Sequence, residues 1–226
     1  MIQSTLNRNY RRLTTPRSAA LAGILFALLF ATSLTLLRIS IPAGLSTDTT
    51  WLTTDRNYIT FALGLTPFAG ITYLWFIGVV RDRLGEYEDR FIASVFYGSS
   101  LLFLAMVFVS MAIMGSMVAA YRLNPEIEAN GQVIYFGRAL IIQLNNVYAV
   151  RMAGVTMMSL ATIWLRTGLG PRWLTFLSFA LALAMLLIIN FSLWVTLIYP
   201  AWVMLISLFI LWMRYKHPER QLTASE

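Results

Sequence analysis

The chain has 226 residues, of which 58% are hydrophobic and only 12% are charged. That is too little charge to cover a soluble globule of this length, so the composition indicates a membrane protein. The net charge of +7 rests almost wholly on arginines that flank apolar runs; this placement indicates membrane topology and argues against nucleic-acid binding. Cysteine is absent, which excludes disulfides and thiolate metal sites.

The first membrane span is predicted at 18–38, after an arginine-rich amino-terminal segment at 1–17 that we expect to be cytoplasmic. The apolar run is longer than that of a secretory signal. Ala19, Gly23, Ala27 and Ala31 recur at every fourth position, which places small side chains on one helix face. Small residues let helices approach closely, so we expect this face to pack within the bundle, with a dimer contact as the alternative.

Segment 39–57 is rich in threonine and carries Pro42 and Gly44, a turn-and-loop composition without a periodic apolar face. We expect an exposed loop there, followed by a second span at 58–80. The charge cluster at 81–90 is predicted to be a solvated turn, with a docking site for a partner as the alternative.

The third and fourth spans, at 90–120 and 133–165, contain more than the about 20 residues that cross a bilayer. Counting back from Arg166 puts the outer boundary of the fourth span near Asn146. Arg138 then falls in a helical extension outside the membrane, and we expect it to be interfacial and dispensable. The methionines of the third span are assigned to core packing rather than to a soft-metal site.

The apolar stretch from Trp173 to Met213 is about twice as long as one span requires, so it must fold back once. The turn is predicted around 190–192, which gives a fifth span at 173–190, a sixth at 193–213 and a polar tail at 214–226. The fold class is therefore an all-α, polytopic bundle of six transmembrane helices. Six spans put both ends on the side that collects most of the arginines, which the positive-inside tendency assigns to the cytoplasm.

Arg151 is the candidate site residue, because it lies about 20 Å of helix from the inner boundary at Arg166, and no acidic residue lies near the middle of any span. In one interpretation its guanidinium snorkels outward or donates to backbone carbonyls and neighbouring polar groups. In the other it forms a pocket for a lipid phosphate or a carboxylate. The same residues serve both interpretations: Arg151, Asn146, Gln143, Tyr148 and Asn190.

The sequence carries little that could support catalysis or cofactor binding within the membrane. The only histidine, His217, lies in the tail, and every carboxylate lies in a loop, at a helix end or in the tail. No metalloprotease, serine-hydrolase or P-loop motif occurs. We therefore expect neither a metal nor another cofactor, and no enzymatic activity.

The segment from Arg166-Thr167-Gly168 to Pro171-Arg172-Trp173-Leu174 resembles a turn found in a group of uncharacterised bacterial multi-pass membrane proteins. Glycine ends one helix there, proline starts the next, and arginine and tryptophan anchor both at the interface. The resemblance implies a six-span protein of the bacterial inner membrane and implies no activity.

Two functions follow as hypotheses. The first is a non-enzymatic bundle in the lipid bilayer that binds an anionic lipid or another amphiphile, or serves as an accessory subunit of a membrane-protein partner. The second is a small transporter of an anionic solute that uses Arg151. A polar cavity at Arg151 would favour ligand binding or transport, whereas a guanidinium closed against carbonyls would favour packing.

Overall fold

A computed structural model of the chain describes residues 16–42, 50–85, 90–123, 131–168, 170–187 and 193–216. These segments are helical almost throughout and contain no strand. Residues 1–15 of the predicted amino-terminal segment and residues 217–226 of the tail lie outside the described residues. The elements are α2 (Pro16–Ser40), α3 (Trp51–Thr54), α4 (Arg56–Gly85), α5 (Arg90–Leu123), α6 (Gly131–Gln143), the π-helix η2 (Leu144–Ala149), α7 (Val150–Thr167), α8 (Arg172–Leu187), the 3-10 helix η3 (Leu193–Leu197) and α9 (Ile198–Lys216).

The length of the apolar helices confirms the membrane-protein class. Five described helices are long and apolar enough to cross a bilayer: Ser18–Ser40, Arg56–Asp82, Arg90–Leu123, Gly131–Thr167 and Trp194–Trp212. The predicted fifth span corresponds to α8, which has 16 residues and is a shorter apolar helix. At 1.5 Å per residue α8 is about 24 Å long, less than the hydrocarbon thickness of about 30 Å, so a crossing by α8 stays a prediction.

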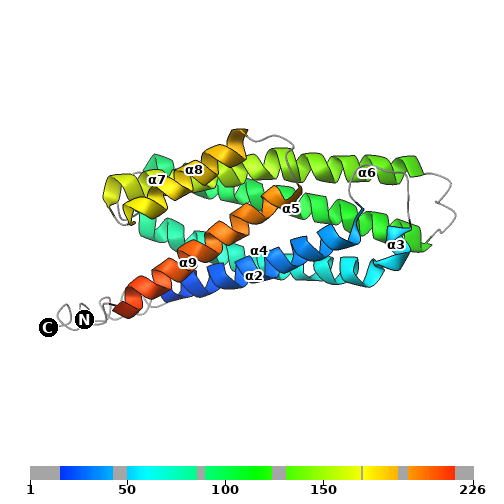
Figure 1. Ribbon diagram of the computed structural model, residues 1–226, viewed down its shortest axis with the longest axis horizontal. Helices are drawn as coiled ribbons and strands as arrows, with labels where there is room; N and C mark the ends of the chain where they lie inside the picture. Colours follow the sequence, from blue (N-terminus) through cyan, green and yellow to red (C-terminus); the bar gives the residue numbers. More distant parts are fainter. Residues whose placement is uncertain are drawn as a thin grey trace, which may run out of the picture.

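The helices form an elongated bundle in which α2 begins and α9 ends at the same end (Figure 1). The chain reverses direction between α8 and α9, as the length of the apolar stretch requires, although the predicted turn at 190–192 lies outside the described residues. Helix α2 packs against α4 and α9, and α7 packs against α5 and α8. Helices α8 and α9 cover only one half of the length, and α3, α6 and the end of α5 form the other half (Figure 1).

Aromatic side chains from four helices form the centre of the core. The ring centroids of Phe26 and Tyr73 lie 4.6 Å apart, as do those of Phe103 and Tyr199, and Trp202 stacks on Tyr199. All five side chains are buried. Such rings contribute large apolar areas and favourable tilted or edge contacts, so they tie α2, α4, α5 and α9 together.

The small-residue face of α2 packs within the bundle, as expected. Ala19 and Ala27 are 3% exposed, and Gly23 is buried at the contact with α9. A Cβ atom at Gly23 would lie 2.1 Å from Oγ of Ser207 and 2.9 Å from Cδ2 of Phe76. A larger residue at this point would therefore require the side chains of Ser207 and Phe76, or the helices themselves, to shift.

The prediction of an exposed loop at 39–57 is wrong for the second half of that segment. Trp51 and Leu52, in the short helix α3, are 3% and 1% exposed and belong to the core. The apolar pair is too short to produce a periodic pattern, so the segment resembled a loop by composition. Residues 43–49 lie outside the described residues.

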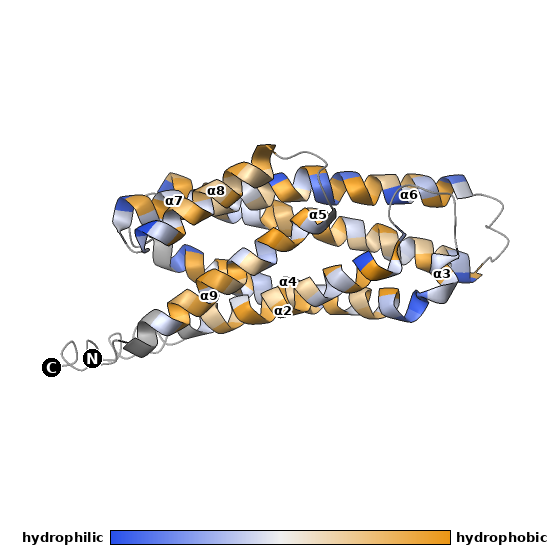
Figure 2. Ribbon diagram, viewed as in Figure 1, coloured by the Kyte–Doolittle hydropathy of each residue, from blue (hydrophilic) through white to orange (hydrophobic). Residues whose placement is uncertain are grey.

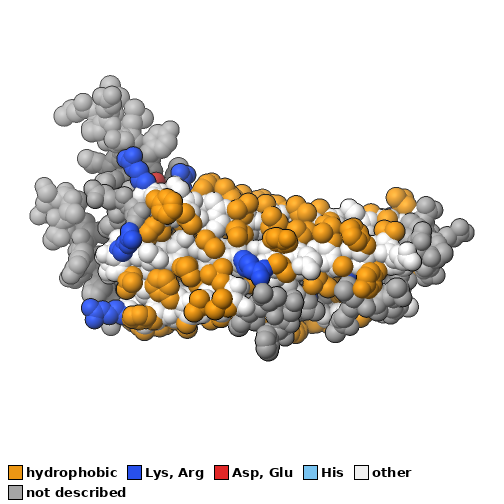
Figure 3. Space-filling view, turned by 90° about the horizontal axis from the view of Figure 1, so that it is seen from above, with side chains coloured by type: hydrophobic (Ala, Val, Ile, Leu, Met, Phe, Trp, Pro, Cys, Tyr) orange, Lys and Arg blue, Asp and Glu red, His pale blue; other side chains and the backbone are white. Residues whose placement is uncertain are grey.

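The surface has the pattern of a bilayer-spanning bundle. Hydrophobic side chains cover its length, and arginine side chains gather towards the end where α2 begins (Figure 3). Figure 2 shows the same distribution along the ribbons, with most hydrophilic residues near the helix ends. Large apolar side chains such as Trp75 and Phe68 are 68% and 62% exposed, which suits contact with hydrocarbon.

Candidate functional site

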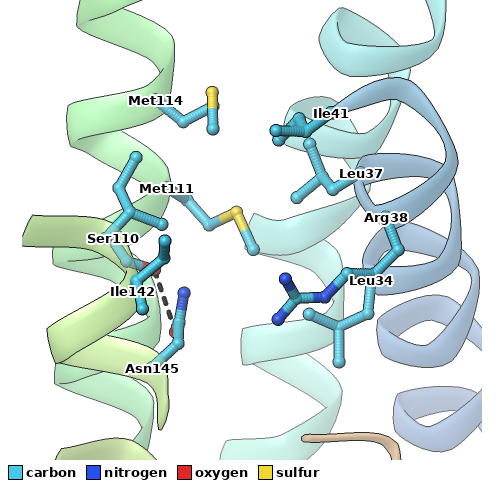
Figure 4. A pocket seen from close by; sticks show the side chains of 10 residues that line it. Leu34, Leu37, Arg38, Ile41, Ser110, Met111, Met114, Ile142 and Asn145 are labelled. Carbon is cyan, nitrogen blue, oxygen red and sulfur yellow. Dashed lines mark hydrogen bonds between the residues drawn. The ribbon is translucent and has the colours of Figure 1, made fainter. Parts of the chain in front are cut away.

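A cavity of about 50 Å³ lies between α2, α5 and the helix formed by α6 and η2 (Figure 4). Each helix contributes residues at helical spacing, which brings them to one face. The lining residues are Leu34, Leu37 and Arg38 in α2, Ile41 just after it, Ser110, Met111 and Met114 in α5, Ile141 and Ile142 in α6, and Asn145 in η2. One water needs about 10–15 Å³ on this measure, so the cavity has room for a group of a few atoms, such as a carboxylate.

Arg38 is the cationic group of this cavity. It lies in the last turn of α2 and is half-buried, and its guanidinium extends towards the wall that contains Asn145 (Figure 4). Its side chain makes no hydrogen bond or ion pair with any described residue. Asp55 and Asp82 are the only acidic side chains in the described part of the chain, and neither lines the cavity. Arg38 therefore offers a half-buried positive charge and free donors to a ligand.

Asn145 faces Arg38 from the π-helix η2, which interrupts the continuous helix Gly131–Thr167, the longest of the five candidate spans in the described residues. Its Oδ1 accepts a hydrogen bond of 3.1 Å from Oγ of Ser110, and its amide nitrogen points into the cavity (Figure 4). The turn is wider than in an α-helix, because the backbone N–H of Val150 donates to the carbonyl of Asn145, five residues earlier. Single-turn π segments inside α-helices frequently mark functional sites.

Arg151, the residue singled out from the sequence, is half-buried and donates from Nη1 to the carbonyl of Val147 at 2.9 Å. The bond lies on its own helix, where the hydrogen-bond pattern changes from π to α. This is the geometry of the packing interpretation. Arg151 does not line the Arg38 cavity.

The other predicted site residues are not brought together with Arg151. Gln143 is exposed, Asn146 is half-buried, and Tyr148 is 56% exposed. No hydrogen bond in the described part of the chain joins the side chain of any of them to that of Arg151. Asn190 lies outside the described residues.

Arg138, which we expected to be interfacial and dispensable, is buried in contacts with other parts of the chain. Its side chain is 4% exposed, and Nη2 donates to the carbonyl of Pro42 at 2.9 Å. The guanidinium carbon lies 5.6 Å from the ring centroid of Trp51. Arg138 therefore fastens the segment after α2 and the helix α3 to α6, a structural role that the span count did not indicate.

A buried set of hydroxyl groups lies deeper in the bundle. The hydroxyls of Tyr73 and Tyr199 are 2.5 Å apart, and both side chains are 0% exposed. Ser100 and Thr156 interact with this pair, and Ser99 lies 2.9 Å from Oγ1 of Thr156. Tyrosine normally lies at the membrane interface, so a tyrosine in mid-span is the sequence signal that a buried polar partner exists.

The sequence interpretation missed Arg38. It appeared to be an ordinary basic residue at the end of an apolar run, which is the usual place for a topology signal. Its lining partners come from three segments that are distant in the sequence, so no local pattern connects them.

The chain matches no known protein family, no curated protein and no solved structure. The residues of the Arg38 cavity therefore carry the functional argument by themselves.

Proposed function

We propose that this is a multi-pass protein of the bacterial inner membrane that binds an anionic group in the Arg38 cavity and has no enzymatic activity. The observation that carries the proposal is the half-buried guanidinium of Arg38 beside a small cavity, with no acidic residue of the described chain in its lining. A charge in such a place is costly unless it is paired, so a cavity that presents it favours an anion.

The anion is a carboxylate or a phosphate, since the planar guanidinium matches both groups and since the cavity holds only a few atoms. It is either a free anion or the head group of an amphiphile. Most of the lining is aliphatic or methionine, which would accommodate the first methylene groups of an acyl chain. This assignment moves the proposed anion site from Arg151 to Arg38.

The orientation belongs to the same proposal. Arg81, Arg90, Arg166 and Arg172 lie in the helix ends near the beginning of α2, whereas Arg56 and Arg122 lie in helix ends of the opposite half. The positive-inside tendency then assigns the first end, with both chain termini, to the cytoplasm. The Arg38 cavity would face the outer half of the bilayer.

Thermal unfolding in detergent tests whether the Arg38 cavity binds an anion and which kind of anion it binds. A ligand that binds only the folded state raises the melting temperature, so inorganic phosphate, acetate and dioctanoyl phosphatidic acid are added to delipidated protein. We expect stabilisation of the wild type and of Arg151→Gln, and its loss in Arg38→Gln. Stabilisation by phosphatidic acid alone identifies an amphiphile, and stabilisation by phosphate or acetate identifies a free anion.

Native mass spectrometry of the extracted protein provides the second measurement. We expect a co-purifying anionic species on the wild type that Arg38→Gln lacks. Equal stabilisation and equal bound mass in the wild type and in Arg38→Gln would overturn the Arg38 site.

A further inference from the structure

A groove of about 720 Å³ runs along one face of α4, in the half of the bundle that contains α3 (Figure 1). This volume is within the range of ligand-binding clefts. None of the residues that line the groove lines the Arg38 cavity, so the two sites are separate.

The groove is deepest at Gly64, where the helix has no side chain between two large rings. Phe61 and Phe68 are 60% and 62% exposed, and a Cβ atom at Gly64 would meet nothing within 4 Å. Positions 61, 64 and 68 are three and four residues apart, which places them on one face of the helix. Glycine in a helix interior costs stability relative to alanine, and no packing contact requires it here. Its effect is an open apolar slot between the two rings.

One end of the groove lies at the level of the lipid head groups. Arg56, Asn57 and Thr60 line this end, in the first turns of α4. The candidate span Arg56–Asp82 has 27 residues and is therefore about 40 Å long, the thickness of a bilayer with its head groups. Arg56, as the first residue of that span, lies where lipid phosphates lie.

The charge at this end of the groove is positive. Arg56 is half-buried, and its side chain makes no hydrogen bond or ion pair with any described residue. The adjacent acid, Asp55, ends α3 and does not line the groove, and no other acidic side chain of the described residues lines it. A guanidinium in this place attracts a phosphate, and no carboxylate of the lining is present to bind the ammonium group of a zwitterionic lipid.

We propose that the groove binds an anionic phospholipid, with its phosphate at Arg56 and one acyl chain between Phe61 and Phe68. The helix rises about 18 Å from Arg56 to Phe68, close to half the thickness of a bilayer with its head groups, so the chain would end near the midplane. The amide of Asn57 can donate to a phosphate or ester oxygen. A cation at the head-group level followed by apolar groups is the order that a phospholipid requires, whereas a partner helix requires no cation there.

Native mass spectrometry tests the role of the charge. Delipidated protein in detergent is mixed with equal amounts of dioleoyl phosphatidylglycerol and dioleoyl phosphatidylcholine. The wild type should carry about tenfold more of the anionic lipid, the factor that corresponds to one charge-assisted hydrogen bond, and Arg56→Gln should carry both equally. Arg122→Gln removes an exposed arginine in the same half of the bundle and should keep the wild-type ratio. Equal ratios in the wild type and Arg56→Gln overturn the proposal.

Gly64→Leu tests the groove itself, because its side chain fills the open space without meeting other atoms at its Cβ. Bound phosphatidylglycerol should fall about tenfold. Gly78→Leu, on the same helix and equally open but outside the groove, is the matched control and should bind as the wild type does. Unchanged lipid binding in Gly64→Leu, or a dimer of the wild type that Gly64→Leu lacks, overturns the lipid. Arg56→Gln alone decides the question if Gly64→Leu melts below Gly78→Leu.

The groove does not depend on the function proposed for the Arg38 cavity, and Arg38→Gln separates the two sites. Arg38→Gln should keep the preference for phosphatidylglycerol. Dioctanoyl chains leave the Phe68 end of the groove empty and lose the contribution of the missing methylene groups, so the short lipid reports on the Arg38 cavity. Loss of the preference in Arg38→Gln with its retention in Arg56→Gln overturns the groove. Retention in Arg38→Gln, without any anion-dependent stabilisation of the wild type by the short lipid, phosphate or acetate, supports the groove and overturns only the Arg38 site.

Discussion

The guanidinium of Arg138 lies over the indole ring of Trp51, with 5.6 Å between the guanidinium carbon and the ring centroid, while its Nη2 donates to the carbonyl of Pro42. One side chain of α6 thus holds both the chain after α2 and the short helix before α4. Both residues are buried, at 4% and 3% exposure, so the contact is shielded from water. Cation–π contacts and hydrogen bonds contribute more to the stability of the fold in such surroundings than at an exposed site.

We therefore expect Arg138→Ala to destabilise the protein by about 2–3 kcal/mol, because it removes a charge-assisted hydrogen bond and a cation–π contact. The measurement is thermal or denaturant unfolding in detergent. Arg122→Ala, at an exposed position near the end of α5, is the control and should change stability by less than about 0.5 kcal/mol. Equal stability of the two variants would show that the Arg138 contacts contribute nothing.

Gly23→Ala should destabilise the bundle by about 1–3 kcal/mol, the usual cost of overpacking. The added Cβ would lie 2.1 Å from Oγ of Ser207 and 2.9 Å from Phe76, so these buried side chains or the helices that carry them would have to shift. Gly78→Ala is the matched control, because a Cβ there meets nothing within 4 Å. A melting temperature for Gly23→Ala equal to that of Gly78→Ala would contradict the close approach.

Tyr73→Phe and Tyr199→Phe should each destabilise by about 1 kcal/mol or more, because each leaves the partner hydroxyl short of a buried hydrogen bond. The double variant should lose less than the sum of the two single variants, since the shared bond is removed only once. A double-mutant cycle on unfolding free energies measures this difference. Strict additivity would mean that the two hydroxyls do not interact.

Arg151→Ala should cost about 1 kcal/mol of stability through the lost bond to the carbonyl of Val147. It should leave the anion-dependent rise in melting temperature intact, because Arg151 lies outside the lining of the Arg38 cavity. The paired measurement with Arg38→Gln distinguishes the two arginines. Loss of the anion effect in Arg151→Ala with its retention in Arg38→Gln would return the site to Arg151.

The long helices could be predicted from the sequence because a span needs about 20 apolar residues, and such runs are visible directly. The close packing at Gly23 could be predicted as well, since four small residues share one helix face. The burial of Trp51 and Leu52 could not, because a buried pair has no periodicity. Arg38 and Arg138 show the same limit: their roles depend on which distant helix end lies opposite them, and a count of distance from the membrane boundary carries no such information.

The π-helix also fixes how the two parts of its helix are rotated about their common axis. Ile141, Asn145, Ala149 and Ala153 follow one another at intervals of four, and in a regular α-helix each such step would turn the side chain by about 40° away from its predecessor. The wide turn at Leu144–Ala149 absorbs this drift, so α6 and α7 present their inner faces in the same direction. Because a π turn is one residue wider than an α turn, deleting one residue there would leave a regular α-helix with the inner faces of α6 and α7 still aligned, so Met157 and Leu160 would stay in the core.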